Sequence, residues 1–267
     1  MALSDGMSSL YLLDMRLLRR RRRGHGPPID VGCATATGAR PDNQDRCEVA
    51  PRWAIISDGA GGSAGGALAA ELTVREVVSH LDASDDVIDA EVLTDAVVSA
   101  NVAVRSRRAS DAAVDAMTAT LTVAVATAVD ADHSSWLVVN VGDSPAWRAD
   151  SYGFTRVTKE HNVAAELVRL GAISRDAARM HPGRHVITRS IGAEDSVTAD
   201  PVRVTLHRDG LLILASDGLE VLDESAMHDA SREASSAADA AHRLVDEALG
   251  NGASDNVTVA VLRHRQQ

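Results

Sequence analysis

The sequence predicts an α+β fold in which two antiparallel β-sheets pack face to face and helices cover their outer surfaces. Short strand-like runs occur in two blocks along the chain, and each block is accompanied by two helix-like segments. Several of these runs stop at an aspartate that has a glycine beside it. Strands in two blocks, each with its own pair of helices, are typical of two packed sheets between helical layers.

The first block consists of three short strands and two long helices. Residues 31–37 and 46–50 are expected to pair antiparallel around a turn at residues 40–45, and residues 53–57 form a third strand that stops at Asp58. The next two segments are rich in alanine and carry apolar residues at helical spacing. They predict helices over residues 64–81 and 87–108.

The middle of the chain returns to strands. Residues 120–125 alternate threonine or alanine with leucine or valine, as a half-buried strand does. Residues 135–141 and 145–148 are expected to form a hairpin across Asp143.

A helical insert and the second block complete the chain. The insert is predicted to hold one helix over residues 162–170, ended by Gly171, and a second that Ser174 caps and that runs to Met180. The later elements are expected to be strands at 185–190, 202–206 and 211–215, a helix at 236–249 and a last strand at 256–262.

Composition limits the class of protein. A chain of 267 residues with no strong linker fits one large domain or two small ones. Because aromatic residues make up only 2%, the core must be built from valine, leucine, isoleucine and alanine. No run approaches the roughly 20 apolar residues of a membrane span. Cys33 and Cys47 have neither metal-ligand spacing nor the pattern of a disulfide framework, so a reducing, cytoplasmic location is expected.

Charge is unevenly distributed along the chain. Residues 1–28 contain six arginines and two aspartates, whereas the rest carries a net charge of −15, against −11 for the whole chain. An acidic body repels nucleic-acid backbones, so no nucleic-acid partner is expected. The basic leader, residues 1–28, is expected to be a disordered tail before a domain at residues 29–267. Its alternatives are a short amphipathic helix on an anionic membrane and a true start at Met15.

Five acidic stretches are the most informative feature of the sequence. An aspartate where a strand ends lies at the rim of a sheet, and an adjacent glycine lets the chain turn away. One such stretch is usually only a turn, but several together would form an all-oxygen site that suits Mg²⁺ or Mn²⁺ and not zinc. The stretches lie at residues 43–45, 58–62, 142–144, 216–218 and 255–256.

In order and setting, these stretches resemble the metal-dependent Ser/Thr protein phosphatases of the PP2C (PPM) family, particularly its compact bacterial members. The resemblance runs from about residue 30 to about residue 263. It implies a four-layer α-β-β-α sandwich with a metal site at one end, between the sheets. The motifs that carry it are Arg-Pro-Asp-Asn-Gln-Asp at 40–45, the glycine-rich loop at 58–66, Thr-Ala-Thr-Leu-Thr at 118–122, Gly-Asp-Ser at 142–144, Thr-Lys-Glu-His-Asn at 158–162, Thr-Arg-Ser-Ile-Gly at 188–192, Ser-Asp-Gly-Leu at 216–219 and Gly-Ala-Ser-Asp-Asn-Val-Thr at 252–258.

The resemblance implies an enzyme that hydrolyses phosphoserine and phosphothreonine in proteins by a metal-bridged hydroxide. Asp58 would bridge two Mn²⁺ or Mg²⁺ ions, and the Gly59 carbonyl would complete the second. Asp217 and Asp255 would hold the first ion. Asp143, with Asp217, would form a weaker third site.

Two further residues receive roles from the resemblance. Arg40 would grip two phosphate oxygens with its guanidinium group, and Asp45 would orient metal-bound water without binding a metal itself. Asn256 is expected to fix its loop by side-chain hydrogen bonds. The expected partners are phosphorylated Ser/Thr proteins, including a cognate Ser/Thr kinase, and the chain is expected to be a monomer.

Four positions depart from the family pattern. Gln44 replaces the usual Glu, which is expected to weaken metal affinity. Ala60 replaces the methionine common in bacterial members; members with a histidine there use it as a general acid, so here solvent would protonate the leaving group. Pro145 replaces an arginine after Asp143-Ser144, and Thr118 replaces a glycine. Every carboxylate assigned to a metal is nevertheless present.

Other functions stay open at this point. A weak or inactive PP2C-fold regulator that binds phosphoproteins or partners is the main alternative, and a small-molecule phosphatase is a second. The glycine series at 59–66 lacks the endings of nucleotide-binding loops. His161, His181 and His185 do not have zinc-ligand spacing, and they fall in an insert that corresponds to the mobile flap of the family.

Overall fold

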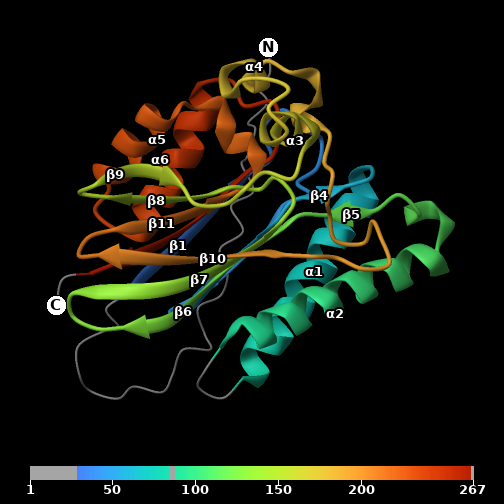
Figure 1. The fold of residues 1–267 in the computed structure, drawn as a ribbon, viewed down its shortest axis with the longest axis horizontal. Coiled ribbons are helices and arrows are strands. Elements are labelled where there is room, and N and C mark those ends of the chain that lie inside the picture. The colour runs from blue at the N-terminus through green and yellow to red at the C-terminus, as the bar shows by residue number, and fades with distance from the viewer. Residues whose placement is uncertain (1–28, 85–87, 266–267) are drawn as a thin grey trace, which may run out of the picture.

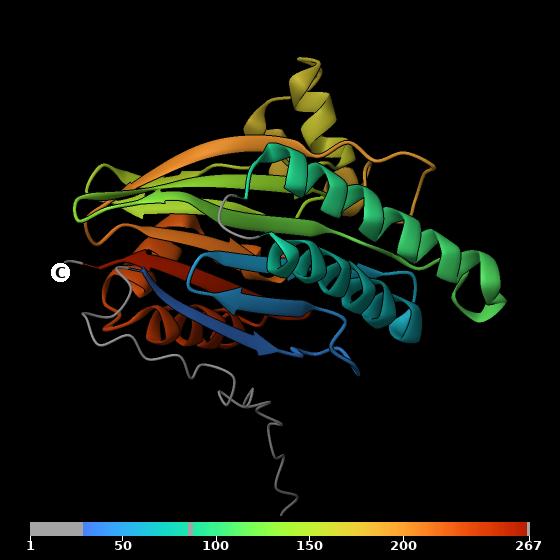
Figure 2. The same ribbon diagram turned by 90° about the horizontal axis from the view of Figure 1, so that it is seen from below.

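Two five-stranded antiparallel sheets stack face to face, and pairs of helices cover their outer surfaces (Figures 1 and 2). The structure is a computed structural model that describes residues 29–84 and 88–265. This arrangement confirms the predicted α+β sandwich. The basic leader at residues 1–28 lies outside the described residues.

One sheet, called sheet A, has its last strand in the interior. The strand order is β1-β12-β11-β8-β9, and every pairing is antiparallel. Its strands are β1 (Ile29–Ala36), β8 (Ala146–Asp150), β9 (Gly153–Arg156), β11 (Leu211–Ala215) and β12 (Val257–His264).

The other sheet, called sheet B, has the order β10-β7-β6-β3-β2 and is also antiparallel. A short antiparallel pair forms a separate two-stranded sheet. It consists of β4 (Gly59–Ala60), which follows β3, and β5 (Thr118–Ala119), which precedes β6 (Figure 1). The strands of sheet B are β2 (Arg46–Ala50), β3 (Trp53–Ser57), β6 (Leu121–Val129), β7 (His133–Val141) and β10 (Asp200–His207).

The helices form two outer layers and one projecting segment. Helices α1 (Ser63–Ala83) and α2 (Ala90–Ser110) cover sheet B, and α5 (Glu224–Arg232) and α6 (Ala237–Gly250) cover sheet A. The projecting segment contains α3 (Val163–Arg169), α4 (Arg175–Arg179) and the 3-10 turn η2 (Pro182–His185), and it stands clear of the sheets in Figure 2. Two more 3-10 turns are η1 (Ala112–Val114) and η3 (Asp217–Val221).

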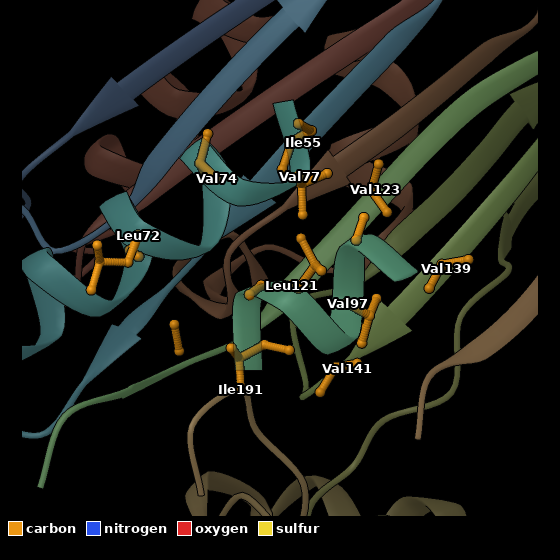
Figure 3. Close-up of a cluster of buried hydrophobic side chains, with 14 of the residues drawn as sticks. Ile55, Leu72, Val74, Val77, Val97, Leu121, Val123, Val139, Val141 and Ile191 are labelled. Carbon is orange, nitrogen blue, oxygen red and sulfur yellow. The ribbon is translucent and has the colours of Figure 1, made fainter. Parts of the chain in front are cut away.

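Three apolar clusters correspond to the layers. The first, part of which Figure 3 shows, packs α1 and α2 on sheet B through residues such as Val77, Val97 and Val123. A second packs α6 on sheet A, and a third, which includes Ile56 and Leu214, fills the space between the sheets. Aliphatic side chains dominate all three, as the low aromatic content requires.

The predicted strand positions are largely confirmed, but two predicted pairings are wrong. β1 and β2 do not form a hairpin, because β1 pairs with β12 and β2 pairs with β3 in the opposite sheet. β7 and β8 do not form one either, because the chain crosses between the sheets at Asp143. In both cases a short connection joins two sheets and not two neighbouring strands.

One predicted strand is absent, and the observed strands β4, β5 and β9 were not predicted. Residues 185–190 contribute only an isolated bridge between Ile187 and Asn162, since the backbone here follows the projecting segment. β9 was not predicted, because its four residues carry little periodicity.

The cysteines also differ from the expectation. Cys33 of β1 and Cys47 of β2 form a disulfide that links the edge strands of the two sheets. Sequence spacing gave no sign of this pairing because folding, not proximity in the chain, aligns the two edges. In the described part of the chain, no helix is sufficiently long and apolar to cross a membrane.

Candidate active site

Five aspartates from both sheets lie near one another at one end of the sandwich, and we call them the carboxylate rim. Asp45 precedes β2 and Asp58 follows β3, both in sheet B. Asp143 lies in the crossover between the sheets, and Asp217 and Asp255 lie after β11 and before β12 in sheet A. Their charges act on one another, as the perturbed pKa values below indicate.

Asp45 is buried and held from the opposite sheet. Its Oδ2 accepts a hydrogen bond of 2.7 Å from Ser216 Oγ, whereas its Oδ1 is buried with no partner among the described residues. Burial raises the pKa of Asp45 to about 6; the bonds from Ser216 and Thr258 oppose this, and the charges of Asp217 and Asp255 reinforce it. One carboxylate oxygen of Asp45 is therefore held by Ser216, and the other is buried.

Asp58 is fixed through its backbone. Its N–H donates to Thr120 Oγ1 at 2.9 Å, and its carbonyl accepts from the Thr120 N–H at 2.8 Å. Burial of the carboxyl group, followed by the charges of Asp45 and Asp217, raises its pKa well above the ordinary value. Such a carboxyl group is poorly solvated and surrounded by like charge, which a cation would relieve.

Asp143 lies where the chain crosses from β7 to β8. Only 5% of it is exposed, and burial together with the charge of Asp217 raises its pKa to about 7. Arg156 of β9 donates a 3.4 Å hydrogen bond to the Asp143 carbonyl and forms ion pairs with Glu160 and Glu220. Arg156 thus tethers this crossover in a chain where proline occupies position 145.

Asp217 begins η3 directly after the buried strand β11. Burial, followed by the charge of Asp255, raises its pKa, while His185 and Arg40 lower it. His185 comes from the projecting segment, and its Nδ1 lies 3.8 Å from Asp217 Oδ2. The projecting segment therefore contacts the rim at this point.

Asp255 forms an ion pair with the expected phosphate-binding residue. Arg40 Nη2 lies 2.8 Å from Asp255 Oδ2, and both side chains are about half exposed to solvent, at 52% and 41%. A phosphate that bound Arg40 would compete with this pair. The structure therefore brings Arg40 to the rim, as predicted, with its guanidinium group turned to a carboxylate.

Asn256 confirms the role expected from the sequence. Its Oδ1 accepts from the Gln44 N–H at 2.9 Å, and its Nδ2 donates to the Thr37 and Asp42 carbonyls at 2.8 and 3.0 Å. One amide thus fastens the turn before β2 to the loop before β12.

Gln44 contacts the glycine-rich loop. With its amide oriented to donate, the nitrogen lies 3.2 Å from both the Gly59 and Gly62 carbonyl oxygens. Gly66 makes room for it, because a Cβ there would clash with the Gln44 side chain. The glycines therefore allow close packing, as expected, and Gln44 competes for the carbonyl of Gly59.

The three histidines of the insert have different environments. His161 is buried and its Nδ1 accepts from the Gly142 N–H at 3.0 Å, while His181 Nδ1 accepts from the Gly183 N–H at 3.0 Å. Both have structural roles, as expected. His185 is 63% exposed and contacts Asp217, which spacing in the sequence did not indicate.

The donors fit a hydrated divalent cation better than a closed metal cage. Within residues 29–84 and 88–265, no three histidine, cysteine or acidic side chains form a ready-made ligand set. Mg²⁺ keeps several waters and needs only one or two carboxylates, so an open rim is compatible with it. The unpartnered Asp45 Oδ1 and the mutually raised pKa values of the rim also favour a bound cation.

Three supporting residues were not identified from the sequence. Ser216 and Thr120 hold Asp45 and Asp58, and Ser144 lies 2.6 Å from Thr120 through their hydroxyl oxygens. Each lies in a motif already quoted for its neighbour. The sequence motifs therefore contained these residues, but only the structure shows which aspartate each hydroxyl group contacts.

Known protein phosphatases match most of this chain. A family described as "Protein phosphatase 2C" matches residues 38–251. The serine/threonine phosphatase stp of Listeria welshimeri is 28% identical over 213 residues, which cover 78% of this chain and 82% of that protein. PstP of Mycobacterium tuberculosis, a serine/threonine protein phosphatase, is 31% identical over 225 residues, 83% of this chain and 42% of PstP.

Solved structures agree with the fold. The PPM Ser-Thr phosphatase MsPP from Mycobacterium smegmatis, in complex with cacodylate, superposes with a TM-score of 0.76 at 32% identity, covering 87% of this chain and 97% of MsPP. The catalytic domain of PstP, in complex with two manganese ions, gives a TM-score of 0.75 at 25% identity, covering 88% and 98% of the two chains.

Proposed function

This chain belongs to the protein phosphatase 2C family and is a metal-dependent serine/threonine protein phosphatase, and we propose that the carboxylate rim is its catalytic centre. The observation that carries the proposal is that aspartates from both sheets and from the crossover gather at one end of the sandwich, where burial and mutual charge raise the pKa of four of the carboxyl groups. Such a cluster destabilises the fold by itself, and divalent cations would offset that cost.

The proposed ligands are those that the family resemblance implies. Asp58, the Gly59 carbonyl, Asp217 and Asp255 would hold two Mn²⁺ or Mg²⁺ ions, and Asp143 with Asp217 would contribute to a third. When bound, these ions supply a water of lowered pKa and screen the charge of the phosphate.

Arg40 and Asp45 would act on the substrate and on water. Arg40 leaves its ion pair with Asp255 and binds two oxygens of the phosphate group, because its guanidinium fork matches their spacing. Asp45 Oδ1, which has no partner, accepts a hydrogen bond from a water molecule in the site and orients it. Ser216 keeps the other carboxylate oxygen in place.

Protonation of the leaving oxygen is assigned to solvent. Ala60 offers no proton donor, and the rim is open enough that Asp217 and Asp255 are partly exposed. The expected consequence is a slower reaction on substrates with basic leaving groups than on activated esters.

The proposed substrates are proteins phosphorylated on serine or threonine. The stp and PstP relatives are described as serine/threonine phosphatases, which supports this class over small phosphate esters. A cognate Ser/Thr kinase among the substrates, a monomeric state and a cytoplasmic location belong to the same proposal. Nothing among the relatives supports the alternative of an inactive regulator.

Phosphate release from a phosphothreonine peptide tests the proposal. EDTA should abolish release, and Mn²⁺ or Mg²⁺ added in excess should restore it, because the proposed ligands are all oxygen. A small phosphate ester of equal charge serves as a second substrate, and the peptide should have the higher kcat/KM. Turnover that survives exhaustive chelation, or restoration by neither ion, would overturn the assignment.

A further inference from the structure

The disulfide between Cys33 and Cys47 has no part in the proposed reaction, yet it encloses residues that do. These are the only two cysteines of the chain. They lie 14 positions apart on β1 and β2, and the segment between them contains Arg40, Gln44 and Asp45.

The two cysteines join parts of the fold that backbone hydrogen bonds do not join. β1 is an edge strand of sheet A and pairs with β12, and β2 is an edge strand of sheet B and pairs with β3. Within the described residues, no strand pairing connects β1 with β2. The disulfide is therefore a covalent link across one open side of the sandwich, next to the rim.

Polar contacts also hold the enclosed turn, among them the bonds of Gln44 to Asn256 and of Ser216 to Asp45. Asn43 Nδ2 donates to Thr35 Oγ1 at 2.8 Å, and Asn256 Nδ2 reaches the carbonyls of Thr37 and Asp42. Arg40 contributes its exposed ion pair with Asp255, which is worth little in stability. Removing the covalent link would leave these polar contacts to position Arg40.

Both cysteines are partly buried residues on edge strands, and Cys47 also packs against the apolar cluster between the sheets. Accessible disulfides exchange with thiols, whereas deeply buried ones do not. Outside oxidising compartments, a protein disulfide is usually transient and redox-sensing.

We propose that Cys33 and Cys47 form a reversible redox site that controls how firmly the turn bearing Arg40 is held. The oxidant is a low-molecular-weight disulfide of the glutathione class. One cysteine thiolate attacks it and releases one thiol; the second cysteine then attacks the mixed disulfide and releases the other. Two cysteine thiols and one small disulfide thus become one protein disulfide and two small thiols.

Thermal unfolding of the full chain tests the covalent link itself. Oxidation with glutathione disulfide should remove both alkylatable thiols, as intact mass shows, and should raise the unfolding midpoint by roughly 5–10 °C, as expected for a 15-residue loop in a chain of this size. The Cys33→Ser/Cys47→Ser double variant should have the reduced protein's midpoint under both conditions. Two reactive thiols in the folded protein after oxidation would overturn the proposal.

Steady-state kinetics with Mn²⁺ and a phosphothreonine peptide test its consequence, and this step rests on the proposed function. Reduction should raise KM several-fold and change kcat less, because Arg40 is proposed to bind the phosphate group. The double variant should show the reduced KM in either condition. An unchanged KM in a protein whose cross-link forms would refute control of the turn. No turnover in any redox state would instead refute the proposed function, while mass and melting would still decide the redox site.

Discussion

The carboxylate rim and the projecting segment lie side by side at one end of the molecule but are held in place differently. Rim residues are fixed by the two sheets: Ser216 holds Asp45, and Thr120 holds the backbone of Asp58. The projecting segment, residues 162–187, which we call the flap, meets the rim through polar contacts such as that of His185 with Asp217.

The exposed surfaces of the two regions differ as much as their anchors. Leu170 and Met180 of the flap are 69% and 84% exposed, and α3 and α4 are capped by their own neighbours, Asn162 and Ser174. The rim, by contrast, is built of carboxyl groups whose burial and mutual repulsion raise their pKa values. The two sheets therefore fix the positions of the rim residues, whereas the helices of the flap are stabilised mainly by contacts within the flap.

Removing a rim carboxylate should have the largest effect. Asp58→Asn should lower phosphate release by more than about 100-fold, because even residues that only support metal ligands cost 10–100-fold when lost. Asp176→Asn, an exposed change in α4 of the flap, is the matched control and should leave the rate near the wild-type value. Steady-state rates at saturating Mn²⁺ measure both. An equal loss of rate in the two variants would contradict the assignment of the catalytic centre to the carboxylate rim.

Arg40→Ala should have the next largest effect and should act on substrate binding. We expect KM for a phosphothreonine peptide to rise roughly 10–100-fold, since hydrogen bonds between charged groups contribute about 1.5–3 kcal/mol. Mn²⁺ affinity, measured by calorimetry, should be unchanged or higher, because Asp255 loses its partner.

Arg175→Ala in the flap controls for loss of an exposed positive charge and should change KM little. Weaker Mn²⁺ binding with a normal KM in Arg40→Ala would show that Arg40 supports the loop and does not bind phosphate.

Stability in the absence of metal should depend on pH through the rim. The folded-state pKa values of Asp45 and Asp143, about 6 and about 7, exceed the ordinary 3.8. Between these values the folded state binds more protons than the unfolded state, so its stability falls as pH rises. In EDTA, the unfolding midpoint should therefore be a few degrees higher at pH 5.5 than at pH 8.

Saturating Mn²⁺ should remove or reverse this pH dependence, since the metal then competes with the protons. The Asp45→Asn/Asp143→Asn double variant in EDTA should also have a flatter profile. A wild-type midpoint that rises with pH in EDTA would mean that the rim carboxyl groups are not strained in the folded protein.

Gln44→Glu should have the smallest effect, and it tests the contact of residue 44 with the glycine-rich loop. A carboxylate would face the Gly59 and Gly62 carbonyl oxygens that the amide now contacts. Without metal, the free energy of unfolding should fall by about 1–3 kcal/mol, the cost of leaving polar groups unpaired. The Mn²⁺ concentration for half-maximal activity should also fall, because the variant adds a negative charge and frees the Gly59 carbonyl.

Gln44→Met is the matched control, since it removes the amide without adding charge. Gln44→Met should lose as much stability as Gln44→Glu. Its Mn²⁺ affinity should rise only by the contribution of the freed Gly59 carbonyl, because it adds no negative charge. Denaturant unfolding in EDTA and Mn²⁺ titration separate the two effects. Unchanged values in Gln44→Glu would show that this side chain does not influence the metal.

Local features of the fold could be predicted from the sequence, but pairings across it could not. β2, β3 and β11 were predicted with their observed bounds because each is a short apolar or alternating run between turns. The turn at residues 40–45 suggested a hairpin, but it connects two sheets. A sequence window does not distinguish these cases, since both require a tight polar turn.

The same limit applies to the site. The motifs identified Asp45 and Asp58, but not the hydroxyls that hold them, because Ser216 is 171 positions from Asp45 and Thr120 is 62 from Asp58. His185 was placed in the flap, yet its approach to Asp217 depends on how the flap folds back.

The interior position of β12 has a consequence for biosynthesis. β12 pairs along its length with β1, from the start of the domain, and also with β11. In a growing chain that has reached residue 250, the edges of β1 and β11 that pair with β12 are still unpaired. Unpaired strand edges can pair with other chains and cause aggregation. Because the pairing of β12 with β1 joins residues more than 220 positions apart, sheet A should assemble slowly. Chaperone demand and inclusion-body formation in this protein should thus depend on sheet A more than on sheet B.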